Sequence, residues 1–494
     1  MQNRLVSGLG WTTISSICRN IVNLLQIAVL TRFLDKSDFG LIAIAQLFVS
    51  FTTLFLDMGI SAGILYKQKI SRKEYSSLFW LNIIFGIALT IILFFVTPLI
   101  TQSYHSDDLN NVVRLLCFTI FFNAFGTQQR TYCQKKSYFK RLAIIEIGSY
   151  LLILTAAILF AVLGFGVYSL ALSTLVGTIV LNLTHFVIAL IKDSRLSFHF
   201  SFSEVIPYIK LGIYQVGASI LDFLTRELDT LIISSTLGLD FLGVYNIAKR
   251  VPVAIYSFIQ PIISRVITPM FAEINNDIQL VRSNFLISTK FLSWISFPMY
   301  ALLAISSPSV ISMLFGSSYI EGSSIMMAFC LVYAFNGVLG LSGALQVAMG
   351  RTDLGLIWTI YLISVTAIVY LFTSKISVIL FIISICILAL INVWACWFIQ
   401  FRQLVQITFK DYISSLIRAC VISFICVTPL LLWNNQLHTF LSIISVLIFC
   451  VLYLFIFCKS KEGAIVLEFA HKNQMPELFI TSLNKIRNFP TFKF

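Results

Sequence analysis

LDKSDFGLIAIA, residues 34–45, and LGLDFLGVYNIA, residues 237–248, are two copies of one pattern within a single chain. Four positions match without a gap at an offset of 203 residues (237 − 34): Leu34, Gly40, Ile44 and Ala45 against Leu237, Gly243, Ile247 and Ala248. Each copy joins two long apolar runs. Similarity at one fixed offset indicates a duplicated structural unit, so the sequence predicts two related halves.

The same offset aligns polar residues in the apolar runs beside each copy. Polar residues spaced 4, 3, 4 and 3 apart lie on one face of a helix. The run before the first copy carries Thr12, Ser16, Arg19, Asn23 and Gln26, and its counterpart carries Gln215, Ser219, Asp222, Arg226 and Asp229. The next run carries Gln46, Ser50, Thr53 and Asp57, with counterparts Lys249, Val253, Tyr256 and Gln260. Two helix pairs that agree on one offset support the duplication.

The composition places these runs in a membrane. Hydrophobic residues make up 58% of the 494 residues and charged residues only 11%, and the mean hydropathy is +0.93. Soluble domains carry about twice that charged fraction. The net charge of +13 does not indicate a nucleic-acid partner, because the basic residues cluster in short connecting loops, as in membrane proteins.

We therefore predict an all-α polytopic membrane protein with about 14 transmembrane helices. The expected spans are 9–30, 39–60, 77–100, 111–131, 143–163, 169–191, 208–237, 243–270, 284–307, 322–346, 356–373, 376–400, 412–433 and 439–458. The duplication divides them into two pseudo-symmetric six-helix lobes around a central cavity, residues 1–204 and 205–400. Two extra helices (401–458) and a tail (459–494), read as an interfacial helix, complete the chain.

The loop charges predict the orientation. With the N-terminus inside, the loops on the far side carry only Arg32, Lys36 and Lys375, while the cytoplasmic segments carry most of the other loop Lys and Arg residues. Both termini are therefore expected in the cytoplasm. The first helix contains Arg19, Asn20 and Asn23, so we interpret it as a retained span and not a signal peptide.

Polar stripes within hydrocarbon require a reason. A charged side chain at mid-span costs at least ~2.5–3.5 kcal/mol, so such faces must meet water or each other, which favours a transporter with a wet cavity. Arginine suits a pyrophosphate; we predict an anion site at Arg19, Arg226 and Lys249. Candidate ion-coupling residues are Asp57, Asp222 and Asp229, and the polar lining is Asn23, Gln26, Gln46, Gln215 and Gln260. Alternatively, Asp222, Arg226 and Asp229 form a structural ion-pair triad.

Other polar residues receive simpler interpretations. Arg130, near a predicted cytoplasmic end, is expected to extend its head group toward the interface; Glu146 begins the fifth span, and His185 is interpreted as a packing residue. No metal-ligand spacing and no hydrolase or nucleotide-binding motif occurs in the sequence, so we expect no enzyme, no metal and no cofactor beyond a coupling Na⁺ or H⁺.

Three stretches carry a resemblance: LTRFLDKSDFG (30–40), FLDMGISAGILYKQKISRKEYSSLFW (55–80) and LDTLIISSTLGLDFLGVYNIAKR (228–250). Together they resemble the bacterial polysaccharide transporter (Wzx-type, WzxC-like) family of the multidrug/oligosaccharidyl-lipid/polysaccharide exporter superfamily. The resemblance implies a flippase that moves an undecaprenyl-pyrophosphate-linked oligosaccharide to the periplasmic leaflet of the bacterial inner membrane, by alternating access, for assembly of a surface polysaccharide such as lipopolysaccharide. It also implies a monomer, with the lipid-linked oligosaccharide, membrane lipids, a polysaccharide polymerase and chain-length machinery as partners.

Two other functions stay open at this point. An ion-coupled drug or metabolite exporter of the same superfamily would share the fold, but an exporter of cations would favour an acidic or aromatic cavity. A membrane-embedded glycosyltransferase or polymerase would need a large periplasmic loop with catalytic carboxylates, and the predicted outer loops are short. The buried cations favour an anionic headgroup.

Overall fold

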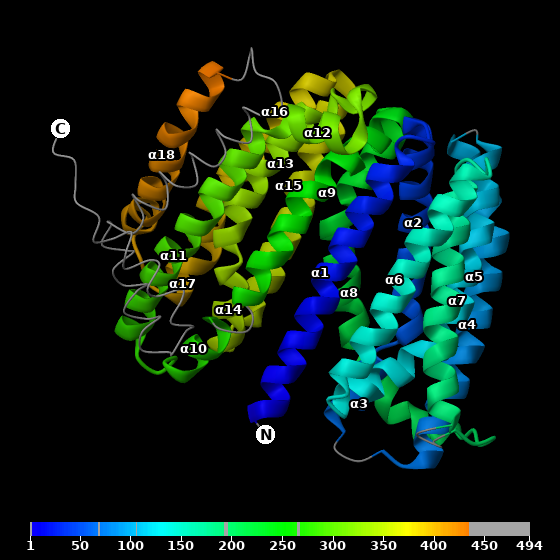
Figure 1. The fold of residues 1–494 in the computed structure, drawn as a ribbon. Coiled ribbons are helices and arrows are strands. Elements are labelled where there is room, and N and C mark those ends of the chain that lie inside the picture. The colour runs from blue at the N-terminus through cyan, green and yellow to red at the C-terminus, as the bar shows by residue number, and fades with distance from the viewer. Residues whose placement is uncertain (1, 68–69, 105, 192–195, 264–266, 434–494) are drawn as a thin grey trace. The chain divides into compact units, whose positions relative to one another are not determined.

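The chain is helical throughout the part that the computed structural model describes, residues 2–67, 70–104, 106–191, 196–263 and 267–433. The first half contains α1 (Gln2–Leu30), α2 (Lys36–Asp57), α3 (Ile60–Tyr66), α4 (Arg72–Thr101), α5 (Asp107–Lys135), α6 (Phe139–Val162), α7 (Tyr168–Ile191), α8 (Phe202–Thr236) and α9 (Gly238–Ile262). The second contains α10 (Thr268–Glu273), α11 (Ile278–Ile305), α12 (Ser307–Phe315), α13 (Gly322–Leu339), α14 (Leu341–Ala348), α15 (Thr352–Ile376), α16 (Val378–Cys396), α17 (Arg402–Leu404) and α18 (Phe409–Trp433). Figure 1 labels these helices and colours the chain from blue at the N-terminus toward red at the C-terminus.

The all-α polytopic prediction is confirmed. Ten helices or joined helix pairs in the described residues are long and apolar enough to cross a membrane. Every predicted span through 412–433 falls on a helix or on consecutive helices; span 439–458 and the tail 459–494 lie outside the described residues. The predicted spans 208–237 and 243–270 fall on α8 and α9, which are not among the ten. Within the predicted span 243–270, α9 runs to Ile262 and α10 begins at Thr268, and residues 264–266 lie outside the described residues.

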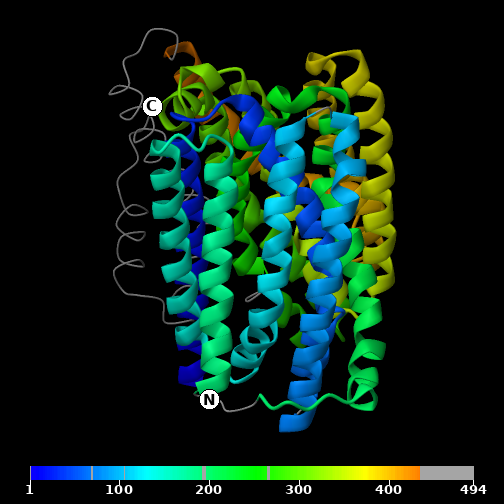
Figure 2. The same cartoon turned by 90° about the vertical axis from the view of Figure 1, so that its right-hand side faces the viewer.

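The described chain forms two compact units. Among the described residues, unit 1 comprises 2–247, Leu314–Tyr319 and Ile363–Ile376, and unit 2 comprises 248–313, Ile320–Leu362 and 377–433. The predicted lobe boundary at residues 204 and 205 stays a proposal, and α8 packs within unit 1 against α2, α3 and α4. Within unit 1, α5 packs on α4 and α7, and α6 packs on α1 and α7; Figure 2 shows these helices, coloured blue to green, running side by side.

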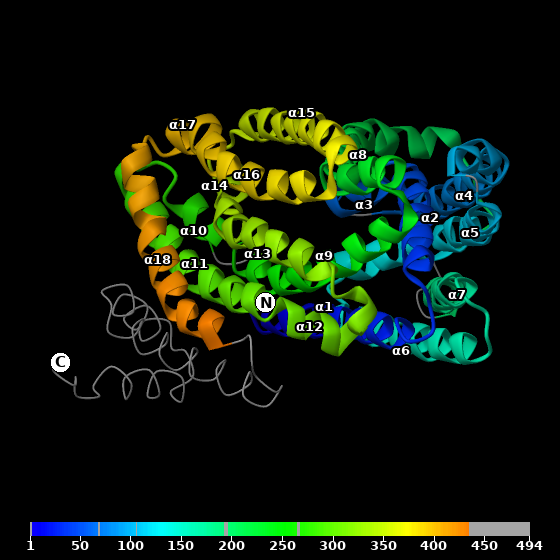
Figure 3. The same ribbon diagram turned by 90° about the horizontal axis from the view of Figure 1, so that it is seen from above.

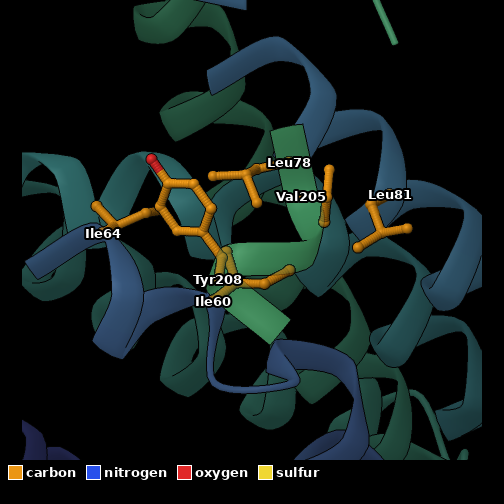
Figure 4. Close-up of a cluster of buried hydrophobic side chains, with 6 residues drawn as sticks. All are labelled: Ile60, Ile64, Leu78, Leu81, Val205 and Tyr208. Carbon is orange, nitrogen blue, oxygen red and sulfur yellow. The ribbon is translucent and has the colours of Figure 1, made fainter. Parts of the chain in front are cut away.

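A buried cluster joins α3, α4 and α8 of unit 1. Figure 4 shows its six members, Ile60, Ile64, Leu78, Leu81, Val205 and Tyr208. The cluster holds α3 against α8, although 135 residues lie between Tyr66, the last residue of α3, and Phe202, the first residue of α8. At the opposite end of α3, the Lys135 ammonium donates to the carbonyls of Ile64 (2.6 Å) and Lys67, which satisfies two carbonyls at the helix C-terminus.

The linker before α8 is held on the start of α4. The Ser77 hydroxyl donates to Glu204 (2.6 Å) and accepts the Ser201 N–H (3.0 Å), and the Trp80 indole donates to the Ser197 carbonyl (3.0 Å). The hydrogen bond from Ser77 holds the pKa of Glu204 below its ordinary value, because it favours the charged carboxylate. These hydrogen bonds fix the N-terminal end of α8 within unit 1.

Unit 2 is organised around α11. This helix packs on α13 and α18, and α13 packs on α16; α11 and α18 lie side by side in Figures 1 and 3. The Tyr300 hydroxyl, which is buried, donates to the Pro252 carbonyl of α9 (3.0 Å). The Ser296 hydroxyl donates to the Ala334 carbonyl of α13 (2.8 Å), a short cross-helix bond of the kind that polar residues make between membrane helices.

The duplicated glycines meet at a close helix crossing inside unit 1. A Cβ on Gly40 would overlap the backbone carbonyl of Leu239, and a Cβ on Gly243 would overlap the backbone carbonyl of Lys36. The offset of 203 residues relates both pairs, since 36 + 203 = 239 and 40 + 203 = 243. The two contacts are therefore equivalent, and the starts of α2 and α9 cross in a pseudo-symmetric arrangement that only glycine at both positions permits.

Candidate functional site

Two exposed charges of the predicted stripes lie on α8. Arg226 pairs with Asp222 one helical turn earlier, and their side chains are 69% and 61% exposed within the structure. Gln215, two turns before Asp222, is also exposed. A pair this exposed on a long helix is not part of the packed interior of its own unit, so it requires water or a polar ligand when the helix lies in a bilayer.

Asp229, the third member of the predicted triad, has a different environment. Its carboxylate accepts the Tyr245 hydroxyl of α9 (2.6 Å) and the backbone N–H of Thr230 (2.8 Å). Tyr245 is fully buried. These bonds fix the turn between α8 and α9, a structural role that the even spacing of the stripe did not indicate.

The α1 stripe is partly turned into unit 1. Arg19 is exposed and lies beside the Tyr150 hydroxyl of α6. Asn23 is half-buried, whereas Gln26 is only 8% exposed. The three residues predicted to share one surface therefore differ in burial, because α6 covers part of the helix face.

Asp57 lies where α2 ends and α3 begins. Met58 and Gly59 both adopt positive φ (43° and 70°), and the Asp57 carboxylate accepts the Ser61 hydroxyl (2.5 Å) and the Ser61 N–H (3.2 Å). The Ser61 hydroxyl also bonds Thr131 of α5 (2.9 Å). Asp57 thus satisfies a donor in the first turn of α3, as a capping side chain does. Gln46, further back on α2, is half-buried.

This geometry gives a test of Asp57. Asp57→Ala should lower the stability of the protein by about 1 kcal/mol, because a first-turn donor and a serine hydroxyl lose their acceptor. Asp57→Asn keeps a side-chain oxygen and should cost less. Thermal unfolding of the two purified variants measures the difference. Loss of transport in Asp57→Asn at unchanged stability would instead assign the predicted ion-coupling role.

Lys249 and Gln260 lie in unit 2. The Lys249 ammonium lies 5.9 Å from the centroid of the Phe329 ring on α13, a cation–π arrangement. Tyr333 stacks near Tyr256 and Tyr300 at 5.6 and 6.4 Å. Gln260 is exposed. The contact of Lys249 with Phe329 was not found from the sequence, because α13 shows no pattern that distinguishes Phe329 from ordinary apolar packing.

Sequence reasoning also missed a polar network between α1, α5 and α6. The Glu146 carboxylate pairs with Arg130 (2.6 Å) and accepts the Ser15 hydroxyl (2.6 Å). A signal was present: Arg130 and Glu146 lie near the facing ends of two helices joined by a three-residue turn, residues 136–138, so antiparallel packing brings them level. Arg130 was instead interpreted as an interface residue.

In the described part of the chain, no group of three or more His, Cys, Asp and Glu side chains is arranged to hold a metal ion. The exposed side chains of the predicted stripes include the guanidinium groups of Arg19 and Arg226, which are suited to binding an anion.

The fold is shared with two solved membrane transport proteins. The lipid II flippase MurJ, in an inward closed conformation, matches 90% of this chain and 96% of its own with a TM-score of 0.74 at 16% identity. An inward-facing multidrug resistance transporter of the MATE family matches 77% of this chain and 94% of its own with a TM-score of 0.58 at 15% identity. The chain is thus a multi-pass membrane protein with a transporter fold.

The family follows from sequence. The family model described as polysaccharide biosynthesis protein matches residues 29–324, more than half of the chain, and the protein belongs to this family. It is 26% identical to the lipopolysaccharide biosynthesis protein WzxC of Escherichia coli (strain K12) over 84% of this chain and 85% of that protein. It is also 26% identical to the teichuronic acid biosynthesis protein TuaB of Bacillus subtilis (strain 168), over 72% and 73%. The recognised resemblance is confirmed.

Proposed function

We propose that this protein is a flippase that moves an undecaprenyl-pyrophosphate-linked oligosaccharide across the inner membrane for surface polysaccharide assembly. The relatives are named for lipopolysaccharide, teichuronic acid and succinoglycan biosynthesis, and a solved structure with the same fold is a lipid II flippase. Family and fold support transport and not catalysis. The observation that carries the proposal is the exposed Asp222–Arg226 pair on α8 in a member of this family.

The substrate assignment rests on the sign of the charges. A pyrophosphate headgroup carries negative charge on several oxygens, and a guanidinium binds such oxygens bidentately while remaining charged. Arg19 and Arg226 are both exposed in unit 1, and Lys249 of unit 2 is half-buried. We assign the anion contacts to these three residues and the polar lining to Asn23, Gln46, Gln215 and Gln260. Asp222 is assigned to ion coupling.

Orientation and partners complete the proposal. Both termini are placed in the cytoplasm by the distribution of Lys and Arg in the loops, and transport runs from the cytoplasmic to the periplasmic leaflet. The protein acts as a monomer, powered by a Na⁺ or H⁺ gradient, and passes its product to a polysaccharide polymerase and chain-length machinery.

Deleting the gene tests this function directly. The deletion strain should accumulate lipid-linked oligosaccharide on the cytoplasmic side of its inner membrane and lose its surface polysaccharide, because the headgroup cannot cross the hydrocarbon unaided. Mass spectrometry of extracted lipids and staining of surface glycan measure the two quantities. The wild-type gene on a plasmid is the control and should restore both. Unchanged surface glycan with no accumulated intermediate would refute the flippase assignment.

A further inference from the structure

Unit 1 contains a second charged group, apart from the α8 pair, between α1, α5, α6 and α7. Glu146 of α6 lies at its centre: one carboxylate oxygen accepts from Arg130 Nη2 of α5 at 2.6 Å, and the other accepts the Ser15 hydroxyl of α1 at 2.6 Å. The Glu146 side chain is 14% exposed, so one carboxylate is nearly enclosed by three helices.

The group holds more positive than negative charge. Tyr150 lies one turn after Glu146. Its hydroxyl interacts electrostatically with the guanidinium groups of Arg130 and Arg19, and Arg19 is within hydrogen-bonding reach of it. Glu146 is the acidic partner that acts on Tyr150 and on His185 of α7. Arg130 pairs with the Glu146 carboxylate and Arg19 lies at Tyr150, one turn away, so these three side chains carry one more positive than negative charge.

Two buried polar groups in this site point to a further ligand. Within the described residues, the Arg130 Nε–H and both ring nitrogens of His185 are buried without a hydrogen-bond partner. His185 is fully buried. Buried donors are almost always paired in folded proteins. Arg130 Nε–H is an unpaired donor, and a neutral His185 ring adds one unpaired N–H, so these groups beside surplus positive charge favour an acceptor-rich anionic ligand.

The site is also reachable from outside the bundle. The Arg130 side chain is 43% exposed, and Arg19 is exposed. Glu146 lies seven residues after the first residue of α6 (146 − 139), which is about 10 Å along the helix at 1.5 Å per residue. A headgroup in the nearby leaflet is within reach of arginine side chains at that depth.

We propose that Arg19 and Arg130 form a phosphate subsite that Glu146 occupies as an internal counter-ion, and that a proton taken up by Glu146 releases the subsite to the lipid-linked substrate. This inference rests on the proposed flippase function and adds the residues that couple it to protons. The proton binds a Glu146 carboxylate oxygen, the ion pair to Arg130 is lost, and the phosphate oxygens take its place. Proton and substrate then bind together, whereas carboxylate and substrate exclude each other.

No other acidic side chain in the described residues is shown to pair with Arg130. Arg130 of α5 pairs with Glu146, which also interacts electrostatically with Tyr150 of α6 and His185 of α7. The other ionisable groups in this region are Arg19 of α1, which acts on Tyr150, and Arg141 of α6, which acts on His185. Arg141 lies 4.8 Å from the Tyr138 ring centroid, and Lys140 lies 5.6 Å from that of Trp11, so both point to aromatic neighbours. Glu146 is thus the carboxylate placed to compete with phosphate for Arg130.

The test measures binding of undecaprenyl pyrophosphate to the full-length protein in nanodiscs at pH 5.5 and pH 8. The wild-type protein should bind about tenfold more tightly at pH 5.5, a typical coupling between two ligands. The probe itself gains negative charge as pH rises, which alone would favour binding at pH 8. Glu146→Gln should bind tightly at both pH values, and Arg130→Gln should bind weakly at both.

Control variants and a second probe make the outcome decisive. Asp353→Asn, which removes the partner of Arg351, should keep the wild-type pH dependence. Ser15→Ala takes one donor from Glu146 and should move the binding midpoint to higher pH, which tests the proposal even if Glu146→Gln fails to fold. Inorganic pyrophosphate, tested alongside, shows whether a free phosphate suffices or the lipid is needed.

Two results separate this inference from the function on which it rests. The Glu146 proposal would be overturned if binding by Glu146→Gln kept the wild-type pH dependence. The flippase function would still stand if the deletion strain accumulated lipid-linked oligosaccharide. If undecaprenyl pyrophosphate bound at neither pH and the deletion strain exported surface polysaccharide normally, both the flippase function and the Glu146 proposal would be overturned.

Discussion

Gly243→Ala should lower the stability of the protein by about 1–3 kcal/mol, the usual cost of inserting atoms into a packed contact. The added Cβ would overlap the backbone carbonyl of Lys36, which cannot rotate away as a flexible side chain does. The starts of α2 and α9 must then separate. Thermal unfolding of the purified protein, followed by size-exclusion chromatography with fluorescence detection, should show a midpoint lowered by several degrees.

The symmetry of the crossing makes a sharper prediction. Gly40→Ala meets the Leu239 carbonyl in the equivalent contact and should cost about as much as Gly243→Ala. Because one substitution already separates the two helices, the double variant should be less destabilised than the sum of the singles, as expected for residues in one contact. Gly343→Ala, with nothing within 4 Å of the added Cβ, is the control and should be neutral or slightly stabilising. Full additivity would mean that the two contacts are independent.

The duplication could be recognised from sequence because its consequences are periodic. Gly40 and Gly243 occupy matched positions in two copies of one pattern, and the helices that carry them were located from apolar length and turn residues. Arg226 and Asp222 were predicted as an i, i+4 pair for the same reason, since helical spacing alone brings them together. Such features can be predicted because each depends on the residue spacing within a single helix.

Features that depend on which helices become neighbours were not predicted. Asp57 shares a stripe with Gln46, yet it bonds Ser61 because Met58 and Gly59 turn the chain after α2. Gly59 also packs against the backbone of Gly212, 153 positions later (212 − 59), which periodicity does not reveal. Arg130 was assigned to the interface and Glu146 was placed at the start of the fifth span, and their pairing was missed because it requires α5 and α6 to pack side by side.

Reversing the α8 pair should abolish export without unfolding the protein. In Asp222→Arg combined with Arg226→Asp, an ion pair at i, i+4 is retained, so insertion and thermal stability should remain close to wild type. The cation, however, moves one turn along the helix, and a carboxylate stands where the phosphate oxygens would bind. Complementation of the deletion strain by the reversed variant, scored as surface glycan, measures the effect.

The single substitution sets the scale. Arg226→Ala should reduce export about tenfold to a hundredfold, because a hydrogen bond from a charged group to the substrate contributes about 1.5–3 kcal/mol and each 1.4 kcal/mol is a factor of ten. Asp222 is then left without its arginine in an apolar helix, so a loss of export alone does not separate binding from structure. The reversed pair separates structure from function: it restores the ion pair, while the cation assigned to binding and the carboxylate assigned to ion coupling both stay displaced. Restored export in the reversed variant would show that Arg226 serves only to neutralise Asp222.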